Sequence, residues 1–595
     1  MRRTRAPVAR PARRSRCPGT SSVLRDRPGD PAPAAPSGGR SDRGRLAAGP
    51  CSSVPPGPTA GRGAPAPRPC RRSAEHLRML PLVRGGSGGL IYFIHEGENH
   101  DELPFHHDEA RPEFLRQLKA CGHTGKEGKV TILYGLAANL PRVAVAGLGK
   151  EEQHEDNSPG AQRKQEIIRT ASALAAQALR DDGAEDFIFY ALGRALDPSP
   201  MAEGALLGLY KYESFKGGRR LGEAPPAGAE RPRFTMGCVA PQFMGVVNPI
   251  PWMNGMRAGH FQNMARDLMN APANYMTPTL FAAEAARLAA QVTEAARGWI
   301  SDAEPMTLKV TAHDRAWAEE QKMGAFLSVT NGSAQSPVFL EVEYLLGEKP
   351  AAGPTVLVGK GVTFDTGGIS IKPSDGMALM KGDMGGAAVV LATILGVAHA
   401  HQEAHLIGLI PLCENMPGGR ATKPGDVVLS RKGSSIEVDN TDAEGRLILC
   451  DALDYAREFR PAAVLNFATL TGAMDVALGF GCAGVFANDE ALWQRIDRHG
   501  RASQDLLWRM PLLDCHRRAM AGTFTDLINL PASGRSAGAC TAAAFLAHFV
   551  PDDQPWAHFD IAGVMHTRRG EGHHVAGMSG RPVRALLSLF LARYH

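Results

Sequence analysis

Residues 358–387, VGKGVTFDTGGISIKPSDGMALMKGDMGGA, hold the features that predict both a fold class and a site. The segment opens on an apolar strand whose end is flanked by Lys360 and Asp365, and it closes on a glycine-initiated apolar helix. Such a strand–turn–helix unit is typical of α/β proteins, which place their binding groups at strand ends. Lys372 and Asp383 lie in the same connection, so the segment predicts a polar site at the edge of a sheet.

Strand-like and helix-like stretches alternate on both sides of this segment. Downstream of residue 276 the strand-like stretches are 336–345, 355–364, 404–412, 462–470, 483–489 and 556–565, with helix patterns at 385–398 and 540–550. Upstream, strand-like stretches at 88–95, 129–135, 142–149 and 185–192 alternate with helix patterns at 163–180 and 201–215. This order predicts two α/β domains, of which the smaller N-terminal one has a mainly parallel sheet.

The predicted domain boundaries follow changes in composition. We expect a disordered Arg/Pro-rich tail over 1–79, an N-terminal α/β domain over 80–250, a linker helix over 251–275 and a larger domain over 276–595. Residues 216–250 are rich in Gly, Pro and Arg, which is typical of a boundary.

Composition excludes several classes of protein. The chain has 595 residues, 44% hydrophobic and 21% charged, which is an ordinary globular mixture. The longest uncharged apolar run, 384–400, begins with glycines and falls short of the ~20 residues of a membrane helix, so we expect no membrane span. Ten cysteines without a CxxC pair predict reduced thiols in an intracellular compartment.

The net charge of +5 is unevenly placed. Residues 1–75 contain 16 Arg, no Lys and four acidic residues, a net +12, so the remainder carries −7. An acidic body gives no support to a nucleic-acid face. The tail also has 14 Pro and 9 Gly, which predicts disorder. Its role stays open between a mitochondrial transit peptide, binding of acidic partners and no function.

Two segments gather ionisable residues beside glycine turns. In 438–449, VDNTDAEGRLIL, Asp442 and Glu444 are two residues apart, so an extended chain would point both to one side, with Arg446 continuing the alternation. Four converging carboxylates would repel one another unless divalent cations lie between them. Oxygen-rich ligation suits Mn²⁺, Mg²⁺ or Zn²⁺. The alternative is a set of surface Asp-Gly turns with incidental salt bridges.

The second segment contains NTDAEGRL (440–447), which matches the signature octapeptide of the leucyl aminopeptidase family, the cytosolic M17-type metallo-exopeptidases. Further segments resemble the family in the expected order: 358–368, 381–388, 411–419, 468–474, 536–546 and 560–565. The resemblance is strong over about 255–595 and extends to 80–250 only in architecture. It implies that 276–595 is the catalytic aminopeptidase domain, a metallo-exopeptidase domain with a central mixed sheet.

The resemblance also implies a role for each site residue. Lys360, Asp365, Asp383 and Glu444 would hold the tighter metal ion, and Asp365, Asp442 and Glu444 the more exchangeable one. Lys372 would donate to the scissile carbonyl oxygen, and Arg446 would hold a bicarbonate ion that acts as general base. The positions implied to line the substrate pocket are Met380, Asn440, Ala443, Thr469, Leu470, Gly472, Ala562 and Met565.

On this basis we expect a two-metal aminopeptidase that releases N-terminal residues from peptides, preferring Leu. The resemblance implies two divalent ions per subunit (Zn, Mn or Mg), a homohexamer and a cytoplasmic location. Two alternatives stay open, a Cys-Gly dipeptidase of glutathione turnover and a DNA-binding role, against which the acidic body argues. The HHVAG stretch (573–577) departs from the family pattern and leaves the pocket rim undefined.

Overall fold

A computed structural model describes residues 88–591 except 104, 106–108, 138–139, 152–158, 191–195, 217–234, 240–249, 298–305 and 535. The predicted tail over 1–79 lies outside the described residues.

The N-terminal domain is built on a five-stranded sheet of order β2-β3-β1-β4-β5. Its strands are β1 (Gly88–Ile94), β2 (Val130–Ala137), β3 (Leu140–Gly147), β4 (Asp186–Tyr190) and β5 (Thr235–Val239). All neighbours pair in parallel except β2, which is antiparallel to β3. The prediction of a mainly parallel sheet is therefore confirmed. β5 lies within 216–250, so part of the stretch interpreted as a boundary belongs to the sheet.

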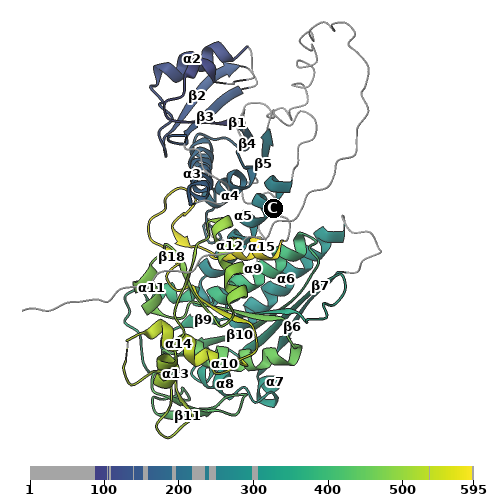
Figure 1. The fold of residues 1–595 in the computed structure, drawn as a ribbon, viewed down its shortest axis with the longest axis vertical. Coiled ribbons are helices and arrows are strands. Elements are labelled where there is room, and N and C mark those ends of the chain that lie inside the picture. The colour runs from purple at the N-terminus through teal and green to yellow at the C-terminus, as the bar shows by residue number, and fades with distance from the viewer. Residues whose placement is uncertain are drawn as a thin grey trace, which may run out of the picture. The chain divides into compact units, whose positions relative to one another are not determined.

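Helices cover both faces of this sheet (Figure 1). α3 (Pro159–Asp181) and α4 (Pro198–Gly208) pack on one face against Phe93 and Phe187, and α2 (Arg111–Ala120) packs on the other against Tyr92. Alternate residues of β1 thus enter opposite hydrophobic cores, as the two-residue period of a strand requires. α4 ends at Gly208, earlier than the predicted 201–215 helix.

The larger domain contains, among the described residues, a nine-stranded sheet of order β15-β14-β17-β13-β8-β10-β7-β6, with β9 paired to β10. Its strands are β6 (Thr307–His313), β7 (Val338–Leu346), β8 (Thr355–Gly359), β9 (Gly361–Asp365), β10 (Ala404–Asn415), β13 (Ala463–Ala468), β14 (Ala483–Ala487), β15 (Leu507–Arg509) and β17 (Trp556–Asp560). The central strands β17, β13, β8 and β10 run parallel, whereas β7, β6 and β14 are antiparallel to a neighbour. The predicted mixed sheet is confirmed.

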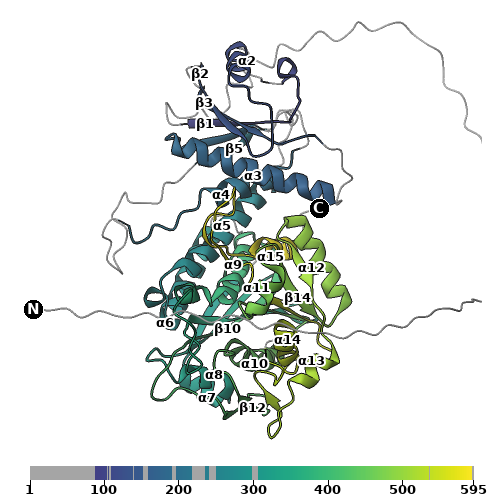
Figure 2. The same cartoon turned by 90° about the vertical axis from the view of Figure 1, so that its left-hand side faces the viewer.

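Two hydrophobic cores lie on the two faces of this sheet (Figures 1 and 2). The first contains α5 (Ile250–Asn270), α6 (Pro278–Arg297), α9 (Gly385–His399), α12 (Glu490–Ser503) and α15 (Val583–Phe590). The second contains α7 (Arg315–Glu320), α8 (Gly324–Thr330), α10 (Gly445–Tyr455) and part of α14 (Gly538–Ala547). α9 is the most apolar of these helices, because it is buried on all sides between the sheet and α5, α6 and α15.

Shorter elements complete the described part of the chain. They are the 3₁₀ helices η2 (His100–Glu102), η4 (Ala273–Tyr275), η5 (Met377–Gly382) and η6 (Ala456–Phe459), the helices α11 (Gly472–Leu478) and α13 (Asp514–Ala519), and the strands β11 (Asp426–Leu429), β12 (Ser435–Val438), β16 (Leu527–Ile528), β18 (His566–Thr567) and β19 (Gly577–Met578).

One helical stretch among the described residues, Met377–His399, meets the length and hydropathy of a membrane span, and 78% of its most apolar window is buried inside the protein. A core helix meets the same criterion, and α9 forms most of this stretch.

Candidate metal centre

The five predicted metal-ligand residues come from connections around the middle of the large sheet. Lys360 separates β8 from β9, and Asp365 ends β9. Asp383 lies between η5 and α9, while Asp442 and Glu444 lie between β12 and α10. The strand predicted over 355–364 is therefore two strands, and the residue that interrupts it is the lysine whose side chain enters the site.

The backbone around Lys360 is held on two sides. Its N–H donates to the carbonyl of Phe467 at 2.9 Å, and its own carbonyl accepts from the N–H of Ala387 at 2.9 Å. This close approach requires the glycines at the start of α9. A Cβ on Gly386 would lie 2.0 Å from the carbonyl oxygen of Phe467, so any side chain there would push the helix away from the lysine.

The Lys360 ammonium lies at the buried end of the cluster. Its Nζ is 2.8 Å from both Asp383 Oδ2 and Glu444 Oε1, and it donates to the carbonyl of Thr469 at 3.0 Å. Burial by itself would lower the pKa of this amine, but the charges of Asp383 and Glu444 outweigh burial and raise the pKa. Without a metal, Lys360 is therefore a cation that neutralises two carboxylates.

Lys372 occupies the more open side of the same cluster. Its Nζ lies 2.7 Å from Asp365 Oδ2 and also forms an ion pair with Asp442. The Lys372 side chain is 22% exposed, against 3% for Lys360. The two lysines thus differ in access to solvent, which the sequence did not show.

Four carboxylates lie close together around only two lysine ammonium groups. One oxygen from each of Asp365, Asp442 and Glu444 lies within 4.8 Å of the others. Burial, and then the charges of Glu444 and Asp383, raise the pKa of Asp365 to about 8, while burial raises the pKa of Asp383 to about 6. Fully ionised, four carboxylates against two ammonium groups would leave a net charge of −2, and the raised pKa values of Asp365 and Asp383 reflect the cost of that charge. Such a donor set fits divalent cations, which favour the ionised carboxylates.

Arg446 presents an unused buried donor. It lies in the first turn of α10, where its Nη1 donates to the carbonyl of Asn529 at 2.8 Å. Its Nε is buried and has no hydrogen-bond acceptor among the described residues. Burial lowers the pKa of Arg446 to about 10, so the group is still a cation at neutral pH. A buried guanidinium with a free N–H fits a small anion.

The prediction that an extended chain aligns Asp442, Glu444 and Arg446 is wrong. The N–H of Ala443 donates to the carbonyl of Asn440 in a turn, and Glu444 is the helical N-cap of α10. The side chains converge because a tight turn leads directly into a helix, so the relevant period is not that of a strand.

The residues implied to line a substrate pocket surround the same connections. Thr469 and Leu470 follow β13, Gly472 begins α11, Ala562 and Met565 follow β17, Met380 lies in η5, and Asn440 and Ala443 lie in the turn before α10. A Cβ on Gly382 would lie 2.5 Å from the methyl carbon of Met578 and 3.5 Å from that of Met565. Methionines thus pack directly against η5, and Met578 is one that the sequence did not single out.

Three buried polar residues that the sequence reasoning missed hold this centre in place. Asn415 Nδ2 donates to Asp365 Oδ1 at 2.8 Å. Asp560 accepts from the backbone N–H groups of Leu470 and Ala562, each at 3.2 Å. Asn529 binds the turn that carries Asp442. No local pattern marks these residues, because each acts on a segment distant in sequence.

Asn529 has the densest set of these contacts. Its Oδ1 accepts from the N–H groups of Asp439 at 2.9 Å and Asn440 at 3.2 Å, and its Nδ2 donates to the carbonyl of Asn440 at 2.7 Å. Its carbonyl accepts from Arg446. The side-chain amide of Asn529 therefore fixes the turn before α10, and its backbone carbonyl holds Arg446 in the first turn of that helix.

We expect Asn529→Ala to reduce both metal content and turnover, because it leaves the donors of this turn unpaired. Each unpaired buried donor costs about 1–3 kcal/mol. Melting temperature, bound metal and kcat should all be measured. Asn466→Ala is the matched control, because Asn466 is equally buried but accepts from Trp556 within the sheet. The control should lower the melting temperature and keep its metal. Full metal content in Asn529→Ala would contradict the assigned role.

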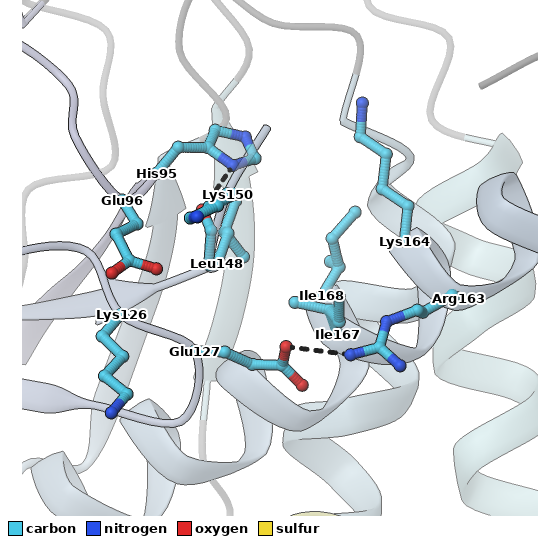
Figure 3. Close-up of a pocket in the computed structure, with 11 residues that line it drawn as sticks. His95, Glu96, Lys126, Glu127, Leu148, Lys150, Arg163, Lys164, Ile167 and Ile168 are labelled. Carbon is cyan, nitrogen blue, oxygen red and sulfur yellow. Dashed lines mark hydrogen bonds and ion pairs between the residues drawn. The ribbon is translucent and has the colours of Figure 1, made fainter. Parts of the chain in front are cut away.

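A cavity of about 310 Å³ opens in the N-terminal domain (Figure 3). It lies beyond the carboxyl ends of β1 and β3, and Arg163 and Glu127 form an ion pair of 3.5 Å beside it. Its lining includes Lys126, Lys150 and Lys164 but none of the predicted metal ligands. The cavity is therefore separate from the candidate metal centre.

Two family models match the chain. The catalytic-domain model of the cytosol aminopeptidase family matches residues 263–587, and the N-terminal-domain model of the same family matches 93–218. The first covers every residue of the candidate metal centre.

Comparison with similar proteins indicates the same family. The chain is 43% identical over 478 residues to the cytosol aminopeptidase of Xenopus tropicalis, covering 80% of this chain and 86% of that protein. It is 40% identical over 534 residues to the cytosol aminopeptidase of Homo sapiens, covering 87% and 96%. Among solved structures, the bottromycin maturation enzyme BotP in complex with Mn is similar at 28% identity and a TM-score of 0.70, over 85% of this chain and 99% of that one. The chain therefore belongs to the cytosol aminopeptidase family and is a metal-dependent aminopeptidase.

Proposed function

We propose that this chain is a two-metal aminopeptidase that releases N-terminal residues from peptides and prefers Leu. The observation that carries the proposal is the cluster of four carboxylates around Lys360 and Lys372, which in its fully ionised form would hold more negative charge than the two lysines balance. Lys360 would lose its proton on metal binding, since only the neutral amine has a lone pair to offer. Lys360, Asp365, Asp383 and Glu444 would then hold one ion, and Asp365, Asp442 and Glu444 the other. Asp365 and Glu444 are then shared.

Bound at these residues, divalent cations would polarise the scissile carbonyl and lower the pKa of a water nucleophile. The chain's own residues supply the remaining steps. Lys372, on the open side of the cluster, donates to the carbonyl oxygen as negative charge develops there. Arg446 has an unused Nε–H and would hold a bicarbonate ion there, which would supply the general base for the attacking water.

The donor chemistry is compatible with Zn²⁺, Mn²⁺ and Mg²⁺, since oxygen ligands dominate and one amine is present. The similar BotP structure contains Mn. We propose Mn²⁺ and Zn²⁺ as the first ions to test at the more exchangeable site, with Mg²⁺ as the third.

The preference for Leu rests on the apolar wall of the proposed pocket. Met380, Met565 and Met578 lie in or against η5, and methionine side chains adapt to a branched aliphatic group. Thr469, Leu470 and Gly472 would contact the peptide backbone, with Asn440, Ala443 and Ala562 completing the lining.

We also propose a homohexamer in the cytoplasm, with the domain boundaries at 80–250, 251–275 and 276–595. The names of the relatives support the location. Six chains would have about six times the 63.4 kDa of one chain, which a light-scattering mass measurement tests directly.

The function is tested on protein stripped of metal and re-supplied with Mn²⁺, Zn²⁺ or Mg²⁺. We expect activity to return as the candidate metal centre regains two ions, and to be higher on Leu-peptides than on Cys-Gly. Preferential hydrolysis of Cys-Gly would support the dipeptidase alternative, and activity without metal would contradict the two-metal proposal.

Removal of residues 1–78 should leave peptidase activity and melting temperature nearly unchanged. The segment is compositionally unsuited to forming a core and lies outside both family matches. Activity and melting temperature of the truncated and full chains should be compared in parallel. A large loss of soluble folded protein would show that the tail contributes to the fold.

A further inference from the structure

A second group of metal-ligating side chains lies where α3 meets the turn at residues 571–574. Ligand atoms of Glu166, His573 and His574 all lie within 4.8 Å of one another. His573 Nε2 is 3.4 Å from Glu166 Oε1, and His574 Nε2 is 4.0 Å from the same oxygen. None of the three belongs to the candidate metal centre.

Three ring nitrogens of the two imidazoles have no hydrogen-bond partner among the described residues. His573 is 1% exposed, and neither of its ring nitrogens has a hydrogen bond among the described residues. His574 Nδ1 is also buried without one. Buried polar atoms are rarely left unsatisfied, and such exceptions indicate a water or ion. Imidazole nitrogens are the commonest metal ligands in proteins.

The backbone of this turn is fixed from both domains. Glu571 and His574 exchange two N–H···O bonds of 2.9 Å. The carbonyl of Gly572 accepts from Gln177 of α3 at 3.0 Å, and the carbonyl of His573 accepts from Arg266 of α5 at 3.2 Å. Gly572 has φ +54°, and a Cβ there would lie 2.8 Å from Thr170. The histidines are therefore held in place before any ion binds.

An ion pair at its second carboxylate oxygen orients Glu166. Its Oε2 accepts from Arg169 Nη1 at 2.5 Å, which leaves Oε1 directed toward the imidazoles. Arg169, Arg266, Arg581 and Arg584 raise the local positive potential, and this opposes cation binding. Glu203 and Asp505 offset it, since Glu203 pairs with Arg169 at 2.7 Å and Arg584 at 3.2 Å, and Asp505 with Arg581 at 2.5 Å.

We propose that Glu166, His573 and His574 bind one further divalent metal ion, with Zn²⁺ the best match, which ties α3 to the 571–574 turn. Two imidazoles and a carboxylate are a common zinc donor set, with water as the fourth ligand. Tetrahedral bonds of ~2.0–2.1 Å separate the ligand atoms by ~3.4 Å. The Glu166–His573 distance of 3.4 Å already fits, the Glu166–His574 distance of 4.0 Å must shorten, and the ligand atoms of the two histidines lie within 4.8 Å of each other.

The proposed ion would act on structure, not on the reaction itself. From the turn the chain continues to Met578, whose side chain packs against Gly382 in η5. Fixing the turn against α3 would therefore steady one wall of the proposed substrate pocket. The proposed site would give the histidines of the HHVAG stretch a structural role beside the pocket.

The test counts zinc in the full-length chain carrying Asp365→Ala and Glu444→Ala, with and without His574→Gln. We expect His574→Gln to lower the count by one Zn²⁺ per chain, irrespective of how much zinc the mutated candidate metal centre still binds. Co²⁺ in place of zinc should give visible absorption of a four-coordinate histidine site that His574→Gln abolishes. Glu166→Gln should also lower the zinc count and the Co²⁺ absorption.

His548→Gln is the control, since His548 is an exposed histidine that is hydrogen-bonded to Ser434 outside the cluster. It should leave the zinc count unchanged. Equal zinc counts with and without His574→Gln, in protein whose circular dichroism is native, would overturn the proposal. A zinc count of two or fewer in the unmutated chain saturated with Zn²⁺ would overturn it as well, independently of any variant.

Discussion

Glu444→Ala and Asp365→Ala are each expected to abolish peptide hydrolysis and to lower the metal content. Both carboxylates are proposed to be shared between two ions, so the loss of either weakens both sites. Both are also buried, and Glu444 lies 2.8 Å from Lys360, which would lose a partner. The effect should exceed the ~10–100-fold that loss of an outer-shell partner costs.

The measurement is bound metal together with kcat on a Leu-peptide. Asp375→Ala is the control, because Asp375 is an exposed carboxylate of the same connection that lies outside the cluster. Asp375→Ala should behave as the unmutated chain does. Retention of both ions and near-normal turnover in either cluster variant would show that the two-metal assignment is wrong.

Lys372→Ala is expected to lower kcat by ~10²–10³ without loss of metal, because loss of one donor to a developing oxyanion has that effect. Lys360→Ala should instead lose metal affinity and recover partly in excess metal, since a weakened site refills by mass action. The geometry supports the distinction. Lys360 is enclosed by Asp383, Glu444 and the carbonyl of Thr469, whereas Lys372 lies on the open side.

Metal titrations of both lysine variants, followed by activity and by bound-metal analysis, decide between these roles. Lys423→Ala serves as the control, because Lys423 pairs with Asp426 on the surface, far along the chain from either lysine. Rescue of both variants by excess metal, or of neither, would mean that the roles of Lys360 and Lys372 are wrongly assigned.

Most elements of the larger domain could be predicted from local pattern. The stretches that became β10, β13 and β17 are buried on both faces, so they are mostly hydrophobic and easily recognised. β7 alternates buried and half-buried residues along most of its length, which is also typical of a strand. The break at Lys360 could not be predicted, because its cause is the approach of α9 and β13 from elsewhere in the chain. β5 was missed for a similar reason, since its pairing with β4 decides it and the surrounding Gly- and Pro-rich composition hides it.

The residues of the candidate site also fall into those that the local sequence marked and those that it did not. Glycine turns beside Asp, Glu and Lys marked the five proposed ligands, because carboxylates that share cations must come in clusters. Asn415, Asn529 and Asp560 left no such mark. Nothing in the neighbouring residues singles them out, and the importance of each depends on hydrogen bonds to another segment.

The sequence by itself determined the fold class, the family resemblance and the identity of the proposed ligands, because these depend on hydrophobic period and on motifs that are contiguous in the chain. Tertiary structure alone decided how Asp442 and Glu444 converge, through a turn and a helix start. It also decided which lysine is enclosed, and that Glu166 meets His573 and His574. Contacts between distant segments set burial and distance, and neither quantity is encoded in the spacing of residues along the chain.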